Sequence, residues 1–188
     1  MIIRELNISE VRRTYKQHIK RDFPAAERKP LAVIERCLER GEYLCLGAFD
    51  GDDMAGYAFF VFCGRICLLD YFAVLPDRRG TGIGSAMIKE LGRYGLRERC
   101  DILLIEVEDP LHVSGSEQTV RHKRLEFYQK NGIISTGVTA VVFGVEYLLL
   151  EYPLGTTHTP MEAAEAYDTL YRSLLPGLIY RRNIFIRT

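Results

Sequence analysis

The feature that most constrains the fold of this chain is a glycine-rich segment that reads RGTGIGS over residues 79–85. An apolar, strand-like run at 66–75 precedes it, and apolar residues recur at helical spacing from Ile83 to Tyr94. Glycine lets a backbone approach a bulky anion because it has no Cβ, and a helix N-terminus offers unpaired N–H groups and a positive dipole end. The segment therefore predicts a strand, a turn that can cradle a phosphate, and a helix.

Two common nucleotide-binding motifs do not fit this segment. A dinucleotide fingerprint, G-x-G-x-x-G, counted from Gly80 needs a third glycine where Ser85 stands. A P-loop ends in Gly-Lys followed by Ser or Thr, and the chain has no Gly-Lys pair. The pattern R-x-x-G-x-G does match, with Arg79, Gly82 and Gly84 in place. A glycine turn that merely caps a helix stays the alternative interpretation.

Composition and charge narrow the class of protein. The 188 residues suit one domain with a sizeable core, and contents of 47% hydrophobic and 27% charged residues are typical of a globular chain. Lys plus Arg and Asp plus Glu each number 25, and this zero net charge argues against nucleic acid as the main partner. No secretory signal pattern is present at the N-terminus, and the apolar run at 138–150 is interrupted by Glu146 and too short to span a bilayer. We therefore expect a cytoplasmic protein with no membrane partner.

Cysteine and histidine spacing gives no sign of a metal site. The cysteines are odd in number, form no C-x-x-C pair and sit mostly in apolar patterns, so we expect buried free thiols in a reducing compartment. The 4 histidines are scattered without ligand spacing, so we expect no metal. The cysteines are Cys37, Cys45, Cys63, Cys67 and Cys100.

Hydrophobic periodicity predicts one domain over residues 1–188 with alternating helices and strands. Neither repeats nor a linker interrupt it. In chain order the predicted elements are a strand at 2–6, helices capped by Ser9 and begun by Pro30, strands at 43–49, 54–62 and 66–75, the helix after the glycine loop, a strand at 101–108, a helix from a Ser114/Glu117 capping box to Asn131-Gly132, a hairpin at 138–151, a helix from a Thr159/Glu162 capping box, and a tail strand at 178–186.

This order resembles the GNAT superfamily of acyl-CoA N-acyltransferases, in which R-x-x-G-x-G is the loop that binds the pyrophosphate of coenzyme A. A second segment, FYQKNGI at 127–133, looks like the F-Y-x-k-x-G-F motif of the same superfamily. The resemblance covers a core of roughly 1–154 and leaves 155–188 as a C-terminal extension. It implies an α+β (mixed α/β) fold. Its central twisted sheet is mostly antiparallel with one parallel, splayed strand pair, and helices lie on both faces, with an extra C-terminal helix and one further strand.

The resemblance also implies acetyl-CoA as a co-substrate and indicates its ligands. The backbone of the loop would bind the pyrophosphate, and the backbone of two residues in the preceding strand would bind the pantetheine arm. Many members carry an Asn before the motif tyrosine; the nearest position here is an arginine, which either meets a phosphate or is solvated. The implied ligands are Ala73, Val74, Arg79, Gly80, Thr81, Gly82, Ile83, Gly84, Ser85 and Arg121.

Three residues are candidates for proton transfer. By resemblance Tyr128 protonates the departing thiolate, and a phenol keeps its proton at neutral pH; a purely anchoring role is the alternative. A carboxylate would help to deprotonate the amine. Glu106 and Glu108 stand two apart on a strand, so we expect them to share a face and the pKa of at least one to be raised. Glu106 is favoured slightly, Asp70 on the neighbouring strand is a rival, and the family often works without a base.

The sequence thus predicts transfer of an acetyl group from acetyl-CoA to a primary amine by direct attack in a ternary complex. The alternatives are a non-catalytic acyl-CoA-binding sensor or scaffold, and an acyltransferase that uses a larger acyl-CoA. The acceptor is left open between a small molecule and a peptide or protein amine, and the assembly between monomer and homodimer. The helix that carries Tyr167, Tyr171 and Leu174 is interpreted as ordinary core, with an acceptor cover or a dimer contact as alternatives.

Overall fold

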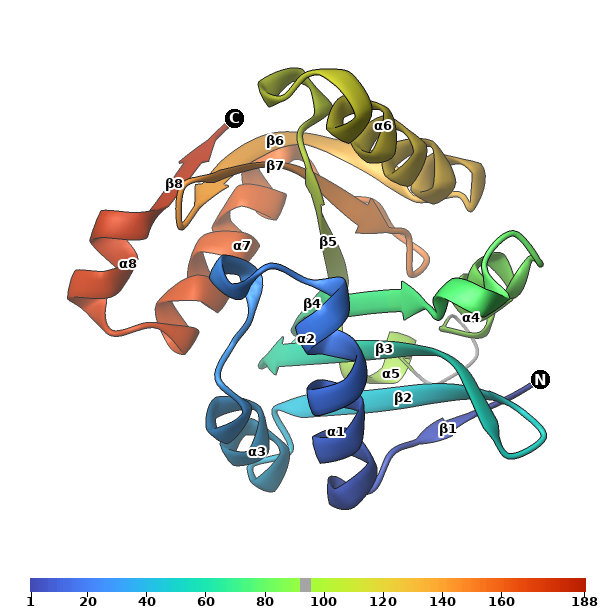
Figure 1. The fold of residues 1–188 in the computed structure, drawn as a ribbon. Coiled ribbons are helices and arrows are strands. Elements are labelled where there is room, and N and C mark those ends of the chain that lie inside the picture. The colour runs from blue at the N-terminus through green and yellow to red at the C-terminus, as the bar shows by residue number, and fades with distance from the viewer. Residues whose placement is uncertain (92–95) are drawn as a thin grey trace. The chain divides into compact units, whose positions relative to one another are not determined.

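The structure is a computed structural model that describes residues 1–91 and 96–188 (Figure 1). The chain forms two compact units, and neither is one continuous segment. The first comprises Met1–Val61 with Leu69–Tyr94, and the second Phe62–Leu68 with Gly95–Thr188. The single domain expected from the sequence stays a prediction. Tyr94, predicted on the helix after the glycine loop, lies outside the described residues.

An antiparallel sheet forms the framework of the first unit. Pairing places Ile2 opposite Phe49, and Tyr43 opposite Val61. The turn between the second and third strands contains Gly51 at a φ of +61°, the left-handed conformation that a tight hairpin turn favours, so the predicted hairpin is confirmed. The strands, in their order across the sheet, are β1 (Ile2–Glu5), β2 (Tyr43–Asp50), β3 (Asp53–Cys63) and β4 (Ile66–Val74).

Several helical segments of the first unit bury apolar side chains. Val11, Ile19 and Ile34 are fully buried. The first helix begins one residue after Asn7, whose side chain accepts a hydrogen bond from the backbone N–H of Glu10, so the predicted cap at Ser9 is wrong. Asn7 is the N-cap because Glu10 lies three residues further on and completes a capping box with it. The helices are α1 (Ile8–Thr14), a π-helical turn (Tyr15–Ile19), α2 (Lys20–Asp22), α3 (Leu31–Glu39) and α4 (Ile83–Leu91).

The second unit contributes four strands to the sheet, paired antiparallel from one to the next. The first residues of β4 belong to this second unit. There β4 lies beside β5, and these two strands form the parallel pair among the described strands. The mixed α/β class with a mostly antiparallel sheet is thereby confirmed. In order across the sheet, the four strands are β5 (Ile102–Glu108), β7 (Val145–Tyr152), β6 (Ile134–Val142) and β8 (Ile184–Arg187).

Two long helices, α6 (Gly115–Lys130) and α7 (Pro160–Leu174), pack on the strands of the second unit, and Figure 1 shows them on different sides of the β6–β7 hairpin.

The tail predicted as a strand over 178–186 is mostly helix. Pro176 precedes a helical turn, and only the last residues reach the sheet as β8. Within the described ranges, no helix is both long and apolar enough to cross a membrane. The helices are α5 (Leu96–Arg99), α6 (Gly115–Lys130), α7 (Pro160–Leu174) and α8 (Gly177–Asn183).

The two capping boxes predicted in this unit have different outcomes. At the start of α7 the box is confirmed: the Thr159 side chain accepts from the Glu162 N–H at 3.3 Å, and the Glu162 carboxylate accepts from the Thr159 N–H at 2.8 Å. At the start of α6 the predicted box is wrong. Ser114 makes no capping hydrogen bond with its side chain, and the Glu117 carboxylate, which would complete the box, bonds to Arg121 at 2.7 Å.

The five cysteines are free thiols, as predicted. Four of them are buried and Cys63 is half-buried. Burial raises the pKa of Cys45 and Cys37, so these two side chains behave as small apolar groups.

The contrast between the two helix starts gives a stability prediction. We expect Thr159→Ala to lower the free energy of unfolding by about 1 kcal/mol, because it removes a capping acceptor. The matched change Ser114→Ala removes a hydroxyl that makes no capping bond, so its effect should stay below about 0.5 kcal/mol. Urea unfolding followed by circular dichroism measures both; equal losses would contradict the assigned caps.

Candidate active site

The glycine-rich segment forms a turn between β4 and α4, as its sequence predicts. A 3₁₀ turn at Pro76–Arg78 leads into it, and two of its glycines have left-handed backbones: φ is +76° at Gly80 and +84° at Gly82. This conformation is strained for residues with a Cβ. A Cβ on either glycine would meet no heavy atom within 4 Å among the described residues beyond its immediate neighbours. The turn therefore needs glycine for its shape and leaves open space beside it.

The N-terminus of α4 follows this turn directly. The helix begins at Ile83, and its first hydrogen bond to the loop runs from the Ala86 N–H to the Gly82 carbonyl at 3.0 Å. The first N–H groups of any α-helix have no acceptor inside the helix. Those groups and the positive end of the helix dipole make this loop a place where an anion is stabilised.

Hydrogen bonds within the first unit hold the loop in shape. Arg78 pairs with Asp50 at 3.3 Å and with Asp53 at 3.8 Å, both at the β2–β3 turn. The Arg79 Nε–H donates to the Val74 carbonyl at 3.0 Å, and the Thr81 hydroxyl donates to the Arg78 carbonyl at 2.6 Å. The Val74 carbonyl, which belongs to a predicted pantetheine contact, thus accepts a hydrogen bond from a residue of the loop. The roles of Ala73 and Val74 toward the coenzyme stay predictions.

Tyr128 lies on α6 in the second unit, with 6% of its surface exposed. Burial raises its pKa to about 12, although the nearby positive charge of Arg124 acts in the opposite direction. Its ring packs edge-on against Phe127, with 5.3 Å between the ring centroids. At neutral pH the phenol therefore keeps the proton that an acid must donate.

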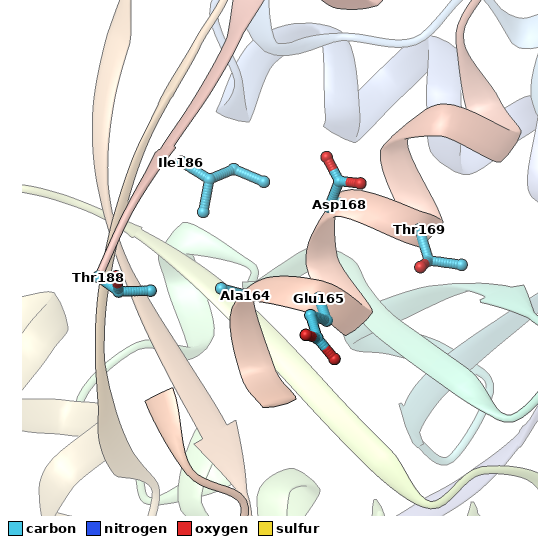
Figure 2. Close-up of a pocket in the computed structure, with 6 residues that line it drawn as sticks. All are labelled: Ala164, Glu165, Asp168, Thr169, Ile186 and Thr188. Carbon is cyan, nitrogen blue, oxygen red and sulfur yellow. The ribbon is translucent and has the colours of Figure 1, made fainter. Parts of the chain in front are cut away.

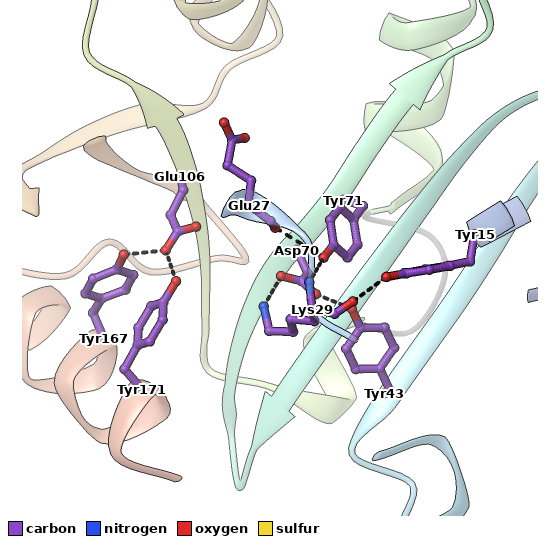
Figure 3. A network of polar contacts seen from close by, with 9 residues as sticks. All are labelled: Tyr15, Glu27, Lys29, Tyr43, Asp70, Tyr71, Glu106, Tyr167 and Tyr171. Atoms are coloured by element: carbon purple, nitrogen blue, oxygen red, sulfur yellow. Dashed lines mark hydrogen bonds and ion pairs between the residues drawn. The ribbon is translucent and has the colours of Figure 1, made fainter. Parts of the chain in front are cut away.

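Glu106 lies on β5 and meets two tyrosines of α7 (Figure 3). The hydroxyls of Tyr167 and Tyr171 both donate to its Oε1, the latter at 2.5 Å. Sequence reasoning missed this contact. The four-residue spacing of the tyrosines places both phenols on one helix face, but no sequence signal indicated which strand this face would meet.

Glu108, two residues along the same strand, has different partners. Its carboxylate pairs with the guanidinium groups of Arg124 and, at 3.3 Å, Arg121, both on α6. The predicted effect of Glu106 and Glu108 on each other stays a prediction. The two carboxylates engage different helices, and two arginines balance the charge of Glu108.

Arg121, a predicted coenzyme ligand, is buried in the second unit. Besides Glu108, it contacts the Glu117 carboxylate at 2.7 Å and donates to the Asp109 carbonyl at 3.1 Å. These contacts hold the start of α6 against the end of β5. A bond from Arg121 to a phosphate stays a prediction.

Asp70, the rival base, is nearly buried in the first unit. It contacts the ammonium of Lys29 and the hydroxyl of Tyr43, and Tyr71 accepts a hydrogen bond from the Lys29 N–H at 2.7 Å (Figure 3). Burial and the neighbouring Asp70 raise the pKa of Tyr43 well above its usual value. Asp70 therefore joins β4 to β2 and to the segment before α3.

A surface pocket of about 480 Å³ lies between α7 and β8 (Figure 2). Asp168, an acidic residue of its lining, bonds to Arg172 at 2.6 Å and to the Tyr180 hydroxyl. The predicted site residues are not among those that line it. The lining residues are Ala164, Glu165, Asp168, Thr169, Ile186 and Thr188.

A family model described as the acetyltransferase (GNAT) family matches residues 11–133, which is more than half of the chain. The chain belongs to the GNAT acetyltransferase family. The match includes the glycine loop and Tyr128 and ends before α7. The family carries out acyl transfer from coenzyme A, and the GNAT resemblance inferred from the two sequence motifs is confirmed.

Solved structures share the fold of this GNAT chain. A GNAT-family protein from Bacteroides thetaiotaomicron is 19% identical with a TM-score of 0.66, over 93% of this chain and 96% of that one. An aminoglycoside 6′-N-acetyltransferase in complex with coenzyme A is 16% identical with a TM-score of 0.59, over 84% and 99%. Spermidine N-acetyltransferase from Vibrio cholerae, in complex with coenzyme A and spermine, is 10% identical with a TM-score of 0.58, over 80% and 94%.

The loop geometry predicts how a charge placed on it affects coenzyme binding. We expect Gly82→Asp to weaken coenzyme A binding at least about tenfold, because a carboxylate would face the pyrophosphate at a helix N-terminus. Gly82→Asn has a similar shape and tolerance of left-handed backbone without the charge, so it should bind more tightly than Gly82→Asp. Isothermal titration calorimetry measures both affinities.

Gly41→Asp is the control for the introduced charge itself. Gly41 also has a left-handed backbone, with a φ of +71°, and follows α3 rather than the loop. We expect this variant to keep the wild-type affinity. If Gly82→Asp bound coenzyme A as tightly as wild type, the loop would not be the pyrophosphate site.

Proposed function

We propose that this protein transfers an acetyl group from acetyl-CoA to a primary amine. The observation that carries the proposal is the left-handed turn at Gly80 and Gly82, which leads directly into α4 in a chain of the GNAT family. One similar structure contains coenzyme A, and another contains coenzyme A with spermine, an amine. These neighbours support an amine acceptor without identifying it.

Backbone groups would do most of the coenzyme binding. In our proposal the N–H groups of residues 79–85 bind the pyrophosphate, and the backbone of Ala73 and Val74 binds the pantetheine arm. The open space beside Gly80 and Gly82 fits a bulky diphosphate, because no Cβ stands between it and the backbone. Arg121 is a further candidate for a phosphate contact. The proposed reaction needs no metal ion.

The proposed chemistry is direct acyl transfer. The neutral amine attacks the thioester carbonyl, a C–N bond forms, and the C–S bond breaks. Backbone N–H groups of β4 polarise the carbonyl oxygen. The departing thiolate takes the proton of Tyr128, whose buried phenol is protonated at the working pH. The phenol then recovers a proton from solvent.

A carboxylate would prepare the amine for attack. Most primary amines are ammonium ions at neutral pH, so the acceptor must lose a proton before it can act as a nucleophile. We assign that step to Glu106. Glu108 is the weaker candidate, because two arginines of α6 already engage its carboxylate.

Thiol release tests the activity directly. Wild-type protein is mixed with acetyl-CoA and a panel of small-molecule amines, polyamines and peptides with free N-termini or lysines, and free thiol is followed by a colorimetric assay. A parallel series with propionyl-CoA and longer donors tests the acyl preference. Coenzyme binding without thiol release from any donor would favour a non-catalytic sensor or scaffold. Faster release from a longer donor would favour an acyltransferase that uses a larger acyl-CoA.

The acid role of Tyr128 predicts a loss of turnover without a loss of binding. We expect Tyr128→Phe to reduce kcat about 100-fold, within the usual range for general acid catalysis, and to leave the Kd of acetyl-CoA unchanged. Tyr152→Phe, on β7, is the control and should keep the wild-type kcat. Full turnover by Tyr128→Phe would exclude the proton-donor role.

The raised pKa of Tyr128 also predicts the pH profile. An acid group with a raised pKa stays protonated up to that pKa and is lost as the pH rises through it. Because burial raises the pKa of Tyr128 to about 12, its deprotonation should not lower kcat between pH 7 and about 10. A decline of wild-type kcat near pH 9 that disappears in Tyr128→Phe would contradict this.

A further inference from the structure

The tyrosine pair of α7 lies outside the residues matched by the family model, yet it contacts the proposed base. Tyr167 is fully buried, and Tyr171 is 5% exposed. Both hydroxyls donate to the same oxygen, Oε1 of Glu106, and the two rings pack edge-on with 4.9 Å between centroids (Figure 3). Two donors on one oxygen fix the orientation of the whole carboxyl group.

The local sequence explains why both phenols reach one strand. Residues four apart lie one turn apart on the same face of a helix, and α7 contacts β5. Ala163 and Leu170, both fully buried, lie on the packed side of the same helix. A buried phenol hydroxyl is costly unless it is hydrogen-bonded, and Glu106 supplies the acceptor for both.

The same contacts favour the charged form of Glu106. Hydrogen bonds donated to a carboxylate stabilise its ionised state, and bonds to a charged group are stronger than neutral ones. Burial and the adjacent carboxylate raise the pKa of Tyr167 well above its usual value, so this phenol remains a donor throughout the working pH range. A carboxylate held in this way is unprotonated, which is the state that a base must have before it takes a proton.

Beside the two phenols, the strands around Glu106 carry one apolar partner and two carboxylates that contact other residues. Its partner across the β5–β7 register is Leu149. On its own strand, Glu108 is bonded to arginines of α6, and further along β7 the Glu151 carboxylate contacts the His158 ring at 2.7 Å. The two phenols are therefore the titratable groups that the described contacts place on Glu106 from α7.

We propose that Tyr167 and Tyr171 are positioning residues that hold Glu106 charged and oriented to take the proton of the acceptor amine. The inference rests on the proposed function and deepens it. In the step concerned, the N–H bond of the acceptor ammonium breaks and an O–H bond forms on Glu106. The nitrogen keeps the electron pair with which it attacks the thioester. After the attack the nitrogen loses its second proton to solvent, the C–S bond breaks, and the thiolate takes one proton from Tyr128. Glu106 then releases its proton to solvent, and Tyr128 recovers one from it.

The acidic limb of the kcat/KM profile tests this role, because it reports protonation of the base in the free enzyme. We expect Tyr171→Phe and Tyr167→Phe each to move that limb to higher pH by about one unit, because the carboxylate loses one donor. The Kd of acetyl-CoA should not change. Tyr180→Phe is the matched control, because the phenol of Tyr180 bonds to Asp168 of α7 and not to Glu106. The acidic limb of its kcat/KM profile should coincide with that of wild type.

A double variant separates positioning from folding. In a Glu106→Gln background the tyrosines have no base to hold, so adding Tyr171→Phe should leave the residual rate and its pH profile unchanged. Thermal unfolding of each single variant shows whether the fold is retained, and a lower Tm with an unmoved limb would indicate a purely structural role. The inference is supported when both single variants shift the limb and the double variant shows no further change.

Other outcomes overturn the inference or the function separately. An unmoved limb in both tyrosine variants, an equal shift in Tyr180→Phe, or a wild-type profile in Glu106→Gln would overturn the inference while thiol release by wild type still supports the function. No thiol release by wild type with any amine would overturn the proposed function itself, and the inference with it.

Discussion

Carboxylates on strands that are buried or half-buried, and that need hydrogen-bond donors, connect elements in both units of this protein. An ionised carboxylate taken out of water is costly unless donors surround it, and each one here lies on a strand and finds donors elsewhere in the fold. Asp70 of β4 bonds to Lys29 before α3, Glu106 of β5 to the phenols of α7, and Glu108 to the arginines of α6. On β7, Glu151 accepts the backbone N–H of His158 just before α7 begins. These pairs determine which segment packs on which strand.

Features set by short stretches of sequence were predictable, and features set by distant partners were not. The glycine turn and the start of α4 depend on neighbouring residues, so their pattern indicated both. The Ser114/Glu117 pattern failed, because Arg121 competes for the carboxylate one turn later. The tail was mistaken for a strand because its apolar residues outweighed the helix start that Pro176 sets. The partners of Glu106 depend on how α7 docks on β5, which periodicity does not encode.

The candidate site divides its tasks between backbone and side chains. In the first unit, the proposed coenzyme loop would use left-handed glycines and helix N–H groups, in a fold shared with structures only 10–19% identical to this chain. In the second unit, the proposed proton transfer would use side chains, and the partners of Glu106 come from a helix beyond the family match. The two parts of the chain therefore face different constraints on substitution.

The bonds within the glycine loop also bear on the thermodynamics of binding. Arg78 joins the loop to the β2–β3 turn, and Thr81 closes it on itself. A loop that such bonds hold in one shape has less conformational entropy to lose when a ligand binds, so more of the contact energy appears as affinity. Coenzyme affinity would then depend on the hairpin turn at Asp50 and Asp53, which itself need not touch the coenzyme. Mutations in a solvent-exposed turn could in this way tune substrate saturation without altering the reacting groups.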